Sequence, residues 1–300
     1  MKKLFTLLVL IIMTLGVSAQ SVRGDLNGDG QVNTSDVTEL YNIIFGTAVD
    51  DTGQSKNLSF TIGDVSFTMV SVSGGTFQMG ATSEQVRYAD SWESPVHSVT
   101  LSDYWIGETE VTQALWQSVM GSNPSYFNGS NRPVEQVSWN DCQTFVNKLN
   151  SLLSGQLPAG RKFRLPTEAE WEFAARGGNK AASQTKYAGS DNIDDVAWYY
   201  DNSYAMGSSF PNYGTHEVAT KAPNALGIYD MSGNVWEWCQ DWYGSYSSDS
   251  QTNPTGPSSG SFRVRRGGSW YNDAGYCWVS IRDYYNPSGS FLIIGLRVAL

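Results

Sequence analysis

The 300-residue chain contains only two histidines, His97 and His216, and three cysteines. An iron site that requires three histidines therefore cannot be built within this sequence. A Ser-His-Asp triad lacks the nucleophile elbow that would support it, and Gly74-Gly75 lacks the lysine and the following helix of a phosphate-binding loop. Charged residues make up 16% of the chain and the net charge is −10, which argues against nucleic acid or an anionic membrane surface as partner.

Long hydrophobic runs are also lacking, apart from one near the N-terminus. Two lysines precede the apolar run Leu4–Leu15, and the small residues Val17-Ser18-Ala19 follow it. This order is typical of a cleaved secretory signal, and the run is shorter than the roughly 20 residues that a membrane span needs. We expect residues 1–19 to be a signal peptide that is cleaved near Ala19. The product would be exported to the periplasm, the cell surface or the medium, without a transmembrane segment.

Residues 20–46 carry the pattern of an EF-hand calcium loop. Gly30 occupies the sixth loop position, where the chain must turn sharply, and an apolar stripe typical of an exit helix ends at Gly46. Oxygen-rich side chains at the other positions suit calcium, a hard cation. The predicted ligands are Asp25, Asn27, Asp29, Gln31 through its backbone carbonyl, and Asp36.

This loop resembles one repeat of a type I dockerin. A full dockerin carries two repeats, and residues 47–63 hold no second ligand pattern, so we assign them to a linker. The resemblance implies a cohesin-like partner and a place in a glycan-degrading complex. Two alternatives stay open at this point. The loop could have a purely structural role and attach the N-terminus to the main domain. Alternatively, it could be an Asp/Asn/Gly-rich linker that binds no metal.

From residue 64 the pattern changes to short strands and helices. Phe67–Val70 and Gly74–Gly80 predict a hairpin with a Gly-Gly turn. The segment Thr167–Arg176 predicts a helix, because Thr167 and Glu170 have the spacing of a capping box. Further helices are expected at 113–120 and 139–153, and further strands at 95–101, 104–112, 263–270 and 295–300.

Three ordered motifs indicate the family of this domain: Arg164–Glu172, Gly233–Trp238, and Arg263–Trp270 followed by Ile294–Arg297. Together they resemble the formylglycine-generating enzyme (sulfatase-modifying factor) family over residues 64–300. The resemblance implies an irregular, C-type-lectin-like α+β fold, preceded here by the small EF-hand-like unit. In catalytic members it also implies copper-dependent oxidation of a sulfatase cysteine.

The family resemblance further implies a second calcium site. Its ligands would be the side chains of Asp230 and Glu237 and the backbone carbonyls of Gly233 and Val235. The alternative is that Asp230 caps a turn while Glu237 pairs with an arginine such as Arg265.

The cysteine pattern departs from the catalytic members, which carry two cysteines after the Gly-Gly-Ser. Asn272 stands at the first position and only Cys277 is present, although Ser269 matches a serine near the family's active site. Copper(I) prefers two soft thiolates, so copper is expected only if an oxidase site survives. Cys239 and Cys277 are a candidate disulfide. Alternatively Cys142, Cys239 and Cys277 are all small buried thiols.

These observations favour an exported, calcium-binding protein with a binding or assembly role at the cell surface, for an exported protein or a glycan ligand. The alternatives are a copper-dependent oxidase that makes formylglycine in sulfatases, and a component of a glycan-degrading complex. Aromatic residues in the C-terminal half could form the binding surface, or could be core. They are Trp198, Tyr199, Tyr200, Trp236, Trp238, Trp242, Tyr243, Tyr246, Trp270 and Tyr271.

Overall fold

The computed structural model describes residues 57–85 and 91–300, together with Val32. The expected signal peptide, EF-hand loop and most of the linker lie outside the described residues. Within the described ranges, none of the helices combines the length and the apolarity that a bilayer crossing requires.

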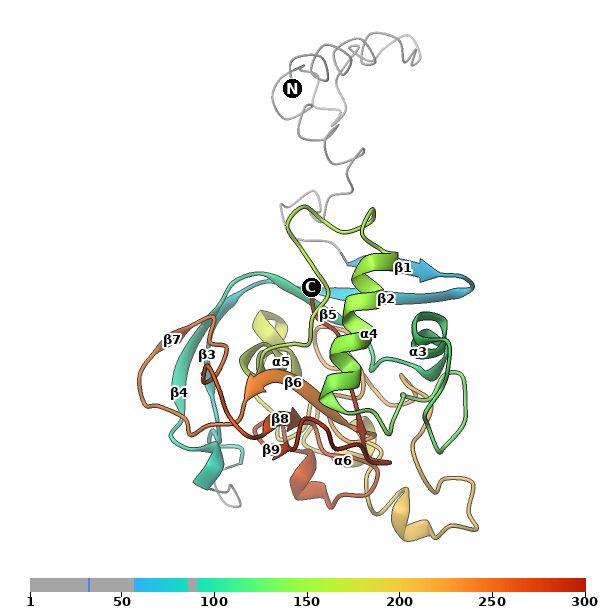
Figure 1. Cartoon of the computed structure of the whole chain (residues 1–300). Coiled ribbons are helices and arrows are strands. Elements are labelled where there is room, and N and C mark those ends of the chain that lie inside the picture. The colour runs from blue at the N-terminus through green and yellow to red at the C-terminus, as the bar shows by residue number, and fades with distance from the viewer. Residues whose placement is uncertain (1–31, 33–56, 86–90) are drawn as a thin grey trace. The chain divides into compact units, whose positions relative to one another are not determined.

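Short strands form three small sheets in the described part of the chain (Figure 1). The first has the order β1-β2-β5 and is antiparallel, the second has the order β3-β4-β7, and the third has the order β10-β6-β8-β9. Their bounds are β1 Leu58–Ile62, β2 Val65–Val72, β3 Gly75–Met79, β4 His97–Leu101, β5 Tyr104–Gly107, β6 Trp236–Trp242, β7 Gln251–Thr252, β8 Arg263–Arg266, β9 Arg282–Tyr285 and β10 Ile294–Gly295.

Two expectations about this region are corrected. Strand β1 lies within the segment that we assigned to the linker, so the ordered domain begins before residue 64. The expected hairpin between β2 and β3 does not form, because β2 pairs with β1 on one edge and with β5 on the other. Strand β3 pairs with β4 in a different sheet. Gly74 permits this crossing, since a Cβ there would lie 2.2 Å from the carbonyl oxygen of Leu101.

The helices follow the sequence pattern closely. Helix α5 begins after Thr167, whose hydroxyl accepts from the Glu170 amide while Glu170 accepts from the Thr167 amide, so the capping box is confirmed. Helix α4 has the same device at Ser138 and Asp141, and buries Cys142 as expected. The bounds are α3 Gln113–Met120, α4 Trp139–Leu152, α5 Glu168–Ala175 and α6 Ile193–Val196, with 3₁₀ turns η1 Ser91–Glu93, η2 Gly178–Lys180, η3 Tyr204–Met206 and η4 Ala274–Cys277.

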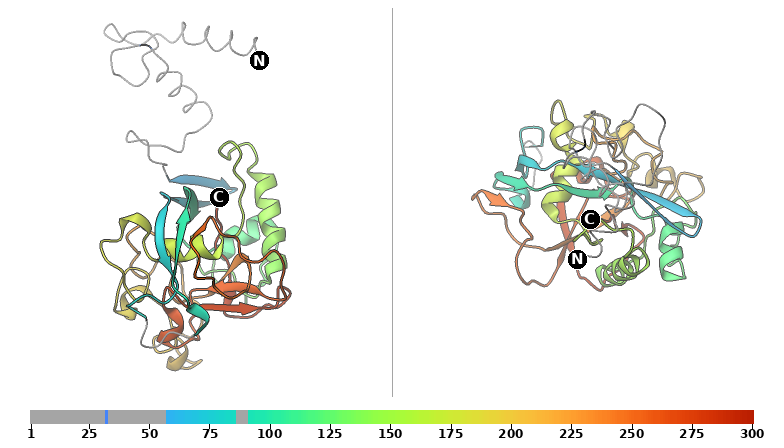
Figure 2. Two further views of the ribbon diagram at one scale, coloured as in Figure 1. Left: turned by 90° about the vertical axis from the view of Figure 1, so that its left-hand side faces the viewer. Right: turned by 90° about the horizontal axis from the view of Figure 1, so that it is seen from above.

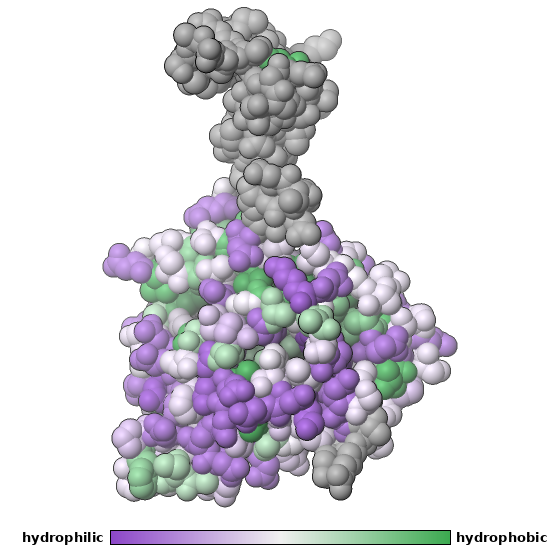
Figure 3. All heavy atoms as spheres, turned by 180° about the vertical axis from the view of Figure 1, so that it is seen from behind, coloured by the Kyte–Doolittle hydropathy of each residue, from purple (hydrophilic) through white to green (hydrophobic). Residues whose placement is uncertain are grey.

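The β3-β4-β7 sheet lies on one side of the domain and helices α3 and α4 on the other, with β6, β8 and β9 between them (Figures 1 and 2). Helix α5 packs against strands of both of these sheets. On the face seen from behind the view of Figure 1, hydrophilic residues predominate and apolar residues form separate spots (Figure 3).

A buried ionic cluster joins α5 to strands β8 and β9. Arg266 contacts Glu168 and Glu172, and Arg282 pairs with Glu168 at 2.6 Å. Arg176 holds the other oxygen of Glu172 at 2.8 Å. Because a buried charge without a partner is costly, these pairs fix where β8 and β9 lie beneath the helix.

Candidate functional site at the Gly-Gly-Ser turn

The Gly-Gly-Ser turn follows β8 and packs closely on the turn η4. Gly267 and Gly268 have φ values of +97° and +74°, a region that favours glycine. A Cβ on Gly268 would lie 2.8 Å from the sulfur of Cys277, so only glycine allows this approach. The turn thereby brings Ser269, Asn272 and Cys277 into one neighbourhood.

Asn272 occupies this neighbourhood as a hydrogen-bonding residue. Its side-chain oxygen accepts from the hydroxyl of Ser269 at 2.5 Å and from the indole nitrogen of Trp236 at 2.9 Å. Its backbone carbonyl accepts from the amide of Tyr200. Ser269 and Trp236 are buried, so the asparagine satisfies two buried donors that would otherwise lose their partners. The Ser269 hydroxyl therefore serves as a structural donor here.

Cys277 is a buried free thiol. Burial raises its pKa to about 12, so the thiolate that would act as a nucleophile or copper ligand is strongly disfavoured. Cys239 is also buried and free, and burial raises its pKa well above the usual value. In this structure the candidate disulfide between Cys239 and Cys277 is not formed, and the alternative of separate buried thiols holds.

An aromatic cluster surrounds Trp270, the residue after the serine. The ring of Trp270 contacts those of Phe127, Tyr213 and Tyr204 with centroids 5.1, 5.2 and 5.9 Å away. Tyr271 packs edge-on against Tyr204 at 4.4 Å. Trp270 is buried while Tyr271 is 45% exposed, so the cluster has an anchored centre and an accessible rim. We call these five residues the aromatic face.

The aromatic face contains only part of the set proposed from the sequence. Trp236, Trp238 and Tyr199 are buried, as the core interpretation stated. Trp198 is covered by the ring of His216, 3.7 Å away, and by Lys221, 4.3 Å from its centroid. Phe127, Tyr204 and Tyr213 were missed, because nothing in their local sequence shows that they converge on Trp270.

Glu135, also missed, lies beneath the face. One carboxylate oxygen accepts from the backbone amides of Tyr126 and Phe127, at 2.6 and 2.8 Å. The other oxygen is buried and has no hydrogen-bond partner in the described structure. Desolvation raises the pKa of Glu135 to about 7. This carboxyl thus positions the loop that carries Phe127, and it titrates near neutral pH.

The segment implied as a second calcium site is held by protein groups. Arg297 donates to both oxygens of Glu237, and the indole of Trp171 donates to one of them at 2.6 Å. The alternative partner Arg265 instead pairs with Asp283. Glu237 therefore has an arginine partner, as the alternative stated, but a different one.

Asp230 is the part of this segment that fits a cation. One of its oxygens accepts from the amide of Ala219 at 2.7 Å, and the other is buried without a partner in the described structure. Burial raises the pKa of Asp230 to about 6 and that of nearby Glu110 well above its usual value. Among the described residues, no three His, Cys, Asp or Glu side chains are grouped to hold a metal ion. The fit is thus partial: Asp230 offers an oxygen and Glu237 does not.

Comparison with known proteins adds the following. The model of the sulfatase-modifying factor enzyme 1-like domain matches residues 64–300. The chaperone protein LppX of Paenibacillus barcinonensis is 34% identical over 275 residues, covering 78% of this chain and 89% of that protein. The formylglycine-generating enzyme of Streptomyces coelicolor is 30% identical, with 77% and 88% covered. The solved structure of Treponema denticola variable protein 1 matches with a TM-score of 0.70 and 37% identity, covering 81% of this chain and 98% of that one.

Proposed function

Because the chain belongs to the sulfatase-modifying factor enzyme 1-like family, we propose that it is a non-catalytic member whose aromatic face binds a polypeptide segment of an exported partner. The α+β fold expected of the family is confirmed. The observation that carries the proposal is the position of Asn272 beside the aromatic face. Its amide oxygen accepts hydrogen bonds from Ser269 and Trp236.

The residues at the turn do not fit copper. Copper(I) favours soft thiolate ligands, whereas Asn272 presents a hard amide oxygen that already accepts two hydrogen bonds. Cys277 is a single thiol, and the cost of ionising it in a buried place is high. This argument favours the accessory role over the oxidase alternative.

A polypeptide is the ligand that best suits the aromatic face. Tyrosine and tryptophan supply large contact area at low entropic cost, and they dominate protein-binding hot spots. Asp201 and Asp273, which adjoin Tyr200 and Asn272 in the sequence, are exposed. We therefore propose a segment with apolar and basic side chains. The relative named as a chaperone protein gives independent support, since a chaperone acts on polypeptides.

Export and calcium belong to the same proposal. The signal-like residues 1–19 would send the chain out of the cytoplasm, where calcium is abundant enough to fill a loop built on Asp25, Asp29 and Asp36. Asp230 would contribute to a second ion if one binds. A cohesin-like partner of the dockerin-like loop stays a prediction.

The test has two arms. A peptide of the form Cys-x-Pro-x-Arg, incubated with the protein, copper and oxygen, should show no formylglycine by mass spectrometry; turnover that is lost in Cys277→Ser would promote the oxidase. A peptide array should show binding to apolar and basic sequences that weakens at least tenfold in Tyr271→Ala. The matched control is Trp92→Ala, since Trp92 is 49% exposed but lies outside the face. Equal loss in both variants, or binding to glycans alone, would contradict the proposal.

A further inference from the structure

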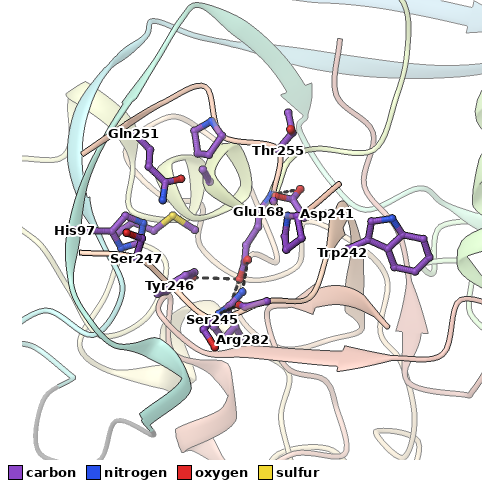
Figure 4. A pocket seen from close by; sticks show the side chains of 16 residues that line it. His97, Glu168, Asp241, Trp242, Ser245, Tyr246, Ser247, Gln251, Thr255 and Arg282 are labelled. Atoms are coloured by element: carbon purple, nitrogen blue, oxygen red, sulfur yellow. Dashed lines mark hydrogen bonds and ion pairs between the residues drawn. The ribbon is translucent and has the colours of Figure 1, made fainter. Parts of the chain in front are cut away.

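A pocket separate from the aromatic face opens at the start of α5. Its volume is about 310 Å³, within the range of small-molecule sites. The end of β6, the loop 244–257 and the first residue of β4 enclose it, and His97, Asp241 and Gln251 point toward its interior (Figure 4). None of the residues of the aromatic face lines this pocket.

Asp241 forms part of the floor and is only 4% exposed. One carboxylate oxygen accepts from the backbone amide of Glu168 at 2.9 Å and so caps α5. The other oxygen, Oδ1, has no hydrogen-bond partner among the described residues. Gly256 closes the loop over it: with φ at +70°, a Cβ at this glycine would lie 3.1 Å from Oδ1. The loop thus leaves Asp241 one free oxygen beside the pocket.

His97 presents a second unpartnered group. Its Nδ1 lies 3.0 Å from the carbonyl oxygen of Pro95, which can only accept, so Nδ1 carries the proton. In the neutral ring Nε2 is then an acceptor, and no described residue donates to it. The ring is 4% exposed and edge-on to Tyr246. Two polar groups, each more than nine-tenths buried, therefore lack partners in the same pocket.

The charged groups beside the pocket are already matched. Glu168 is held by Arg282 at 2.6 Å and accepts from the hydroxyl of Tyr246. The face of Tyr246 is also used, since the guanidinium of Arg282 lies 3.9 Å from its centroid. What remains for a ligand is a set of uncharged hydrogen-bonding groups, which includes the side chains of Ser245, Gln251 and Thr255.

We propose that this pocket binds a small, neutral, hydroxyl-rich molecule of the saccharide class, about one sugar residue in size. A hydroxyl both donates and accepts, so one sugar can donate to His97 and exchange hydrogen bonds with Asp241. The acceptor Nε2 of His97 and the carboxylate of Glu168 disfavour an anion, while the guanidinium of Arg282 disfavours a cation. Met79, Pro254 and Pro257 supply apolar wall for the C–H faces of the ring.

Burial supports the role of Asp241 as a neutral partner. Desolvation, together with the neighbouring carboxylate of Glu168, raises the pKa of Asp241 to about 8. At neutral pH the carboxyl is therefore mostly protonated and can donate to a hydroxyl oxygen.

The test is calorimetric titration of the full chain with glucose, galactose and N-acetylglucosamine, beside glucosamine and glucose 6-phosphate as charged counterparts. At least one neutral sugar should bind saturably, and more tightly than the charged forms. Asp241→Ala removes the carboxyl and with it the cap on the Glu168 amide, and Gln251→Ala removes one side-chain amide from the wall of the pocket. Each should weaken binding about tenfold, the loss expected for one hydrogen bond in a desolvated site.

The controls separate this site from the aromatic face. Gln156→Ala removes a glutamine outside the pocket and should leave sugar affinity unchanged, and so should Tyr271→Ala. If Asp241→Ala lowers the melting temperature sharply, Gln251→Ala carries the test alone. The absence of saturable binding by every neutral sugar, or tighter binding of a charged one, would overturn the proposal. Unchanged affinity in folded Asp241→Ala and Gln251→Ala would do the same. Peptide binding at the face is unaffected by any of these outcomes.

Discussion

Replacement of Asn272 by cysteine tests whether the amide holds the turn. The change removes the oxygen that accepts from the Ser269 hydroxyl and from the indole of Trp236. The Trp236 side chain is almost fully buried, so its N–H loses its acceptor, at a cost of about 1–3 kcal/mol. The serine hydroxyl can rotate toward another acceptor and adds less. We expect Asn272→Cys to lower the free energy of unfolding by about 2 kcal/mol.

Asn272→Asp is the matched control, because it keeps an acceptor oxygen in the same place. Urea unfolding under reducing conditions should rank wild type first, Asn272→Asp next and Asn272→Cys last. A cysteine variant as stable as wild type would refute the reasoning, since the two hydrogen bonds would then contribute nothing to the free energy of unfolding. The same variant can be titrated with copper(I). If the two thiols now bind the ion, copper(I) should raise the urea midpoint of unfolding by mass action. That result would show that the missing thiol is the reason why the wild-type site does not bind copper.

Two further predictions concern protonation and metal. Glu135 has a folded pKa near 7 and an ordinary value of 4.5, so its stabilising neutral form is lost as pH rises between these values. Wild type should therefore lose up to about 3 kcal/mol relative to Glu135→Gln between pH 4.5 and 8, measured by urea unfolding; parallel pH profiles would contradict this. For calcium, calorimetry should lose one binding event in Asp29→Ala, and Asp230→Asn should remove a second if that site fills; full stoichiometry in both variants would reject both sites.

Local signals account for the parts of the fold that the sequence predicted. Helix α5 could be anticipated because its cap uses residues three apart, and α4 because its apolar residues recur along one face. The turn at Gly267 and Gly268 also follows from the sequence, since both residues take the positive φ that glycine favours.

The errors and omissions arise from contacts between distant segments. Gly74 and Gly75, at the start of β3, suggest a hairpin with β2, yet the edges of β2 are taken by β1 and β5. The partner of Glu237 is Arg297, sixty residues away, although Arg265 is nearer in the sequence. The sugar-sized pocket depends on the same kind of contact, because loop 244–257 must fold over Asp241 before the pocket exists.

The ionic cluster under α5 explains how a member of this family can lack a cysteine at position 272 and keep its fold. The segment 267–281 carries the whole Gly-Gly-Ser neighbourhood, and its two flanking residues, Arg266 and Arg282, both contact the carboxylate of Glu168. Because these pairs are buried, removing Glu168 would leave Arg282 without a carboxylate partner and cost about 3–5 kcal/mol. The ends of the segment are therefore fixed by charges outside it. Asn272 is held within the segment by its bonds to Ser269 and Trp236, whereas the exposed side chain of Tyr271 can vary with the ligand proposed for the aromatic face.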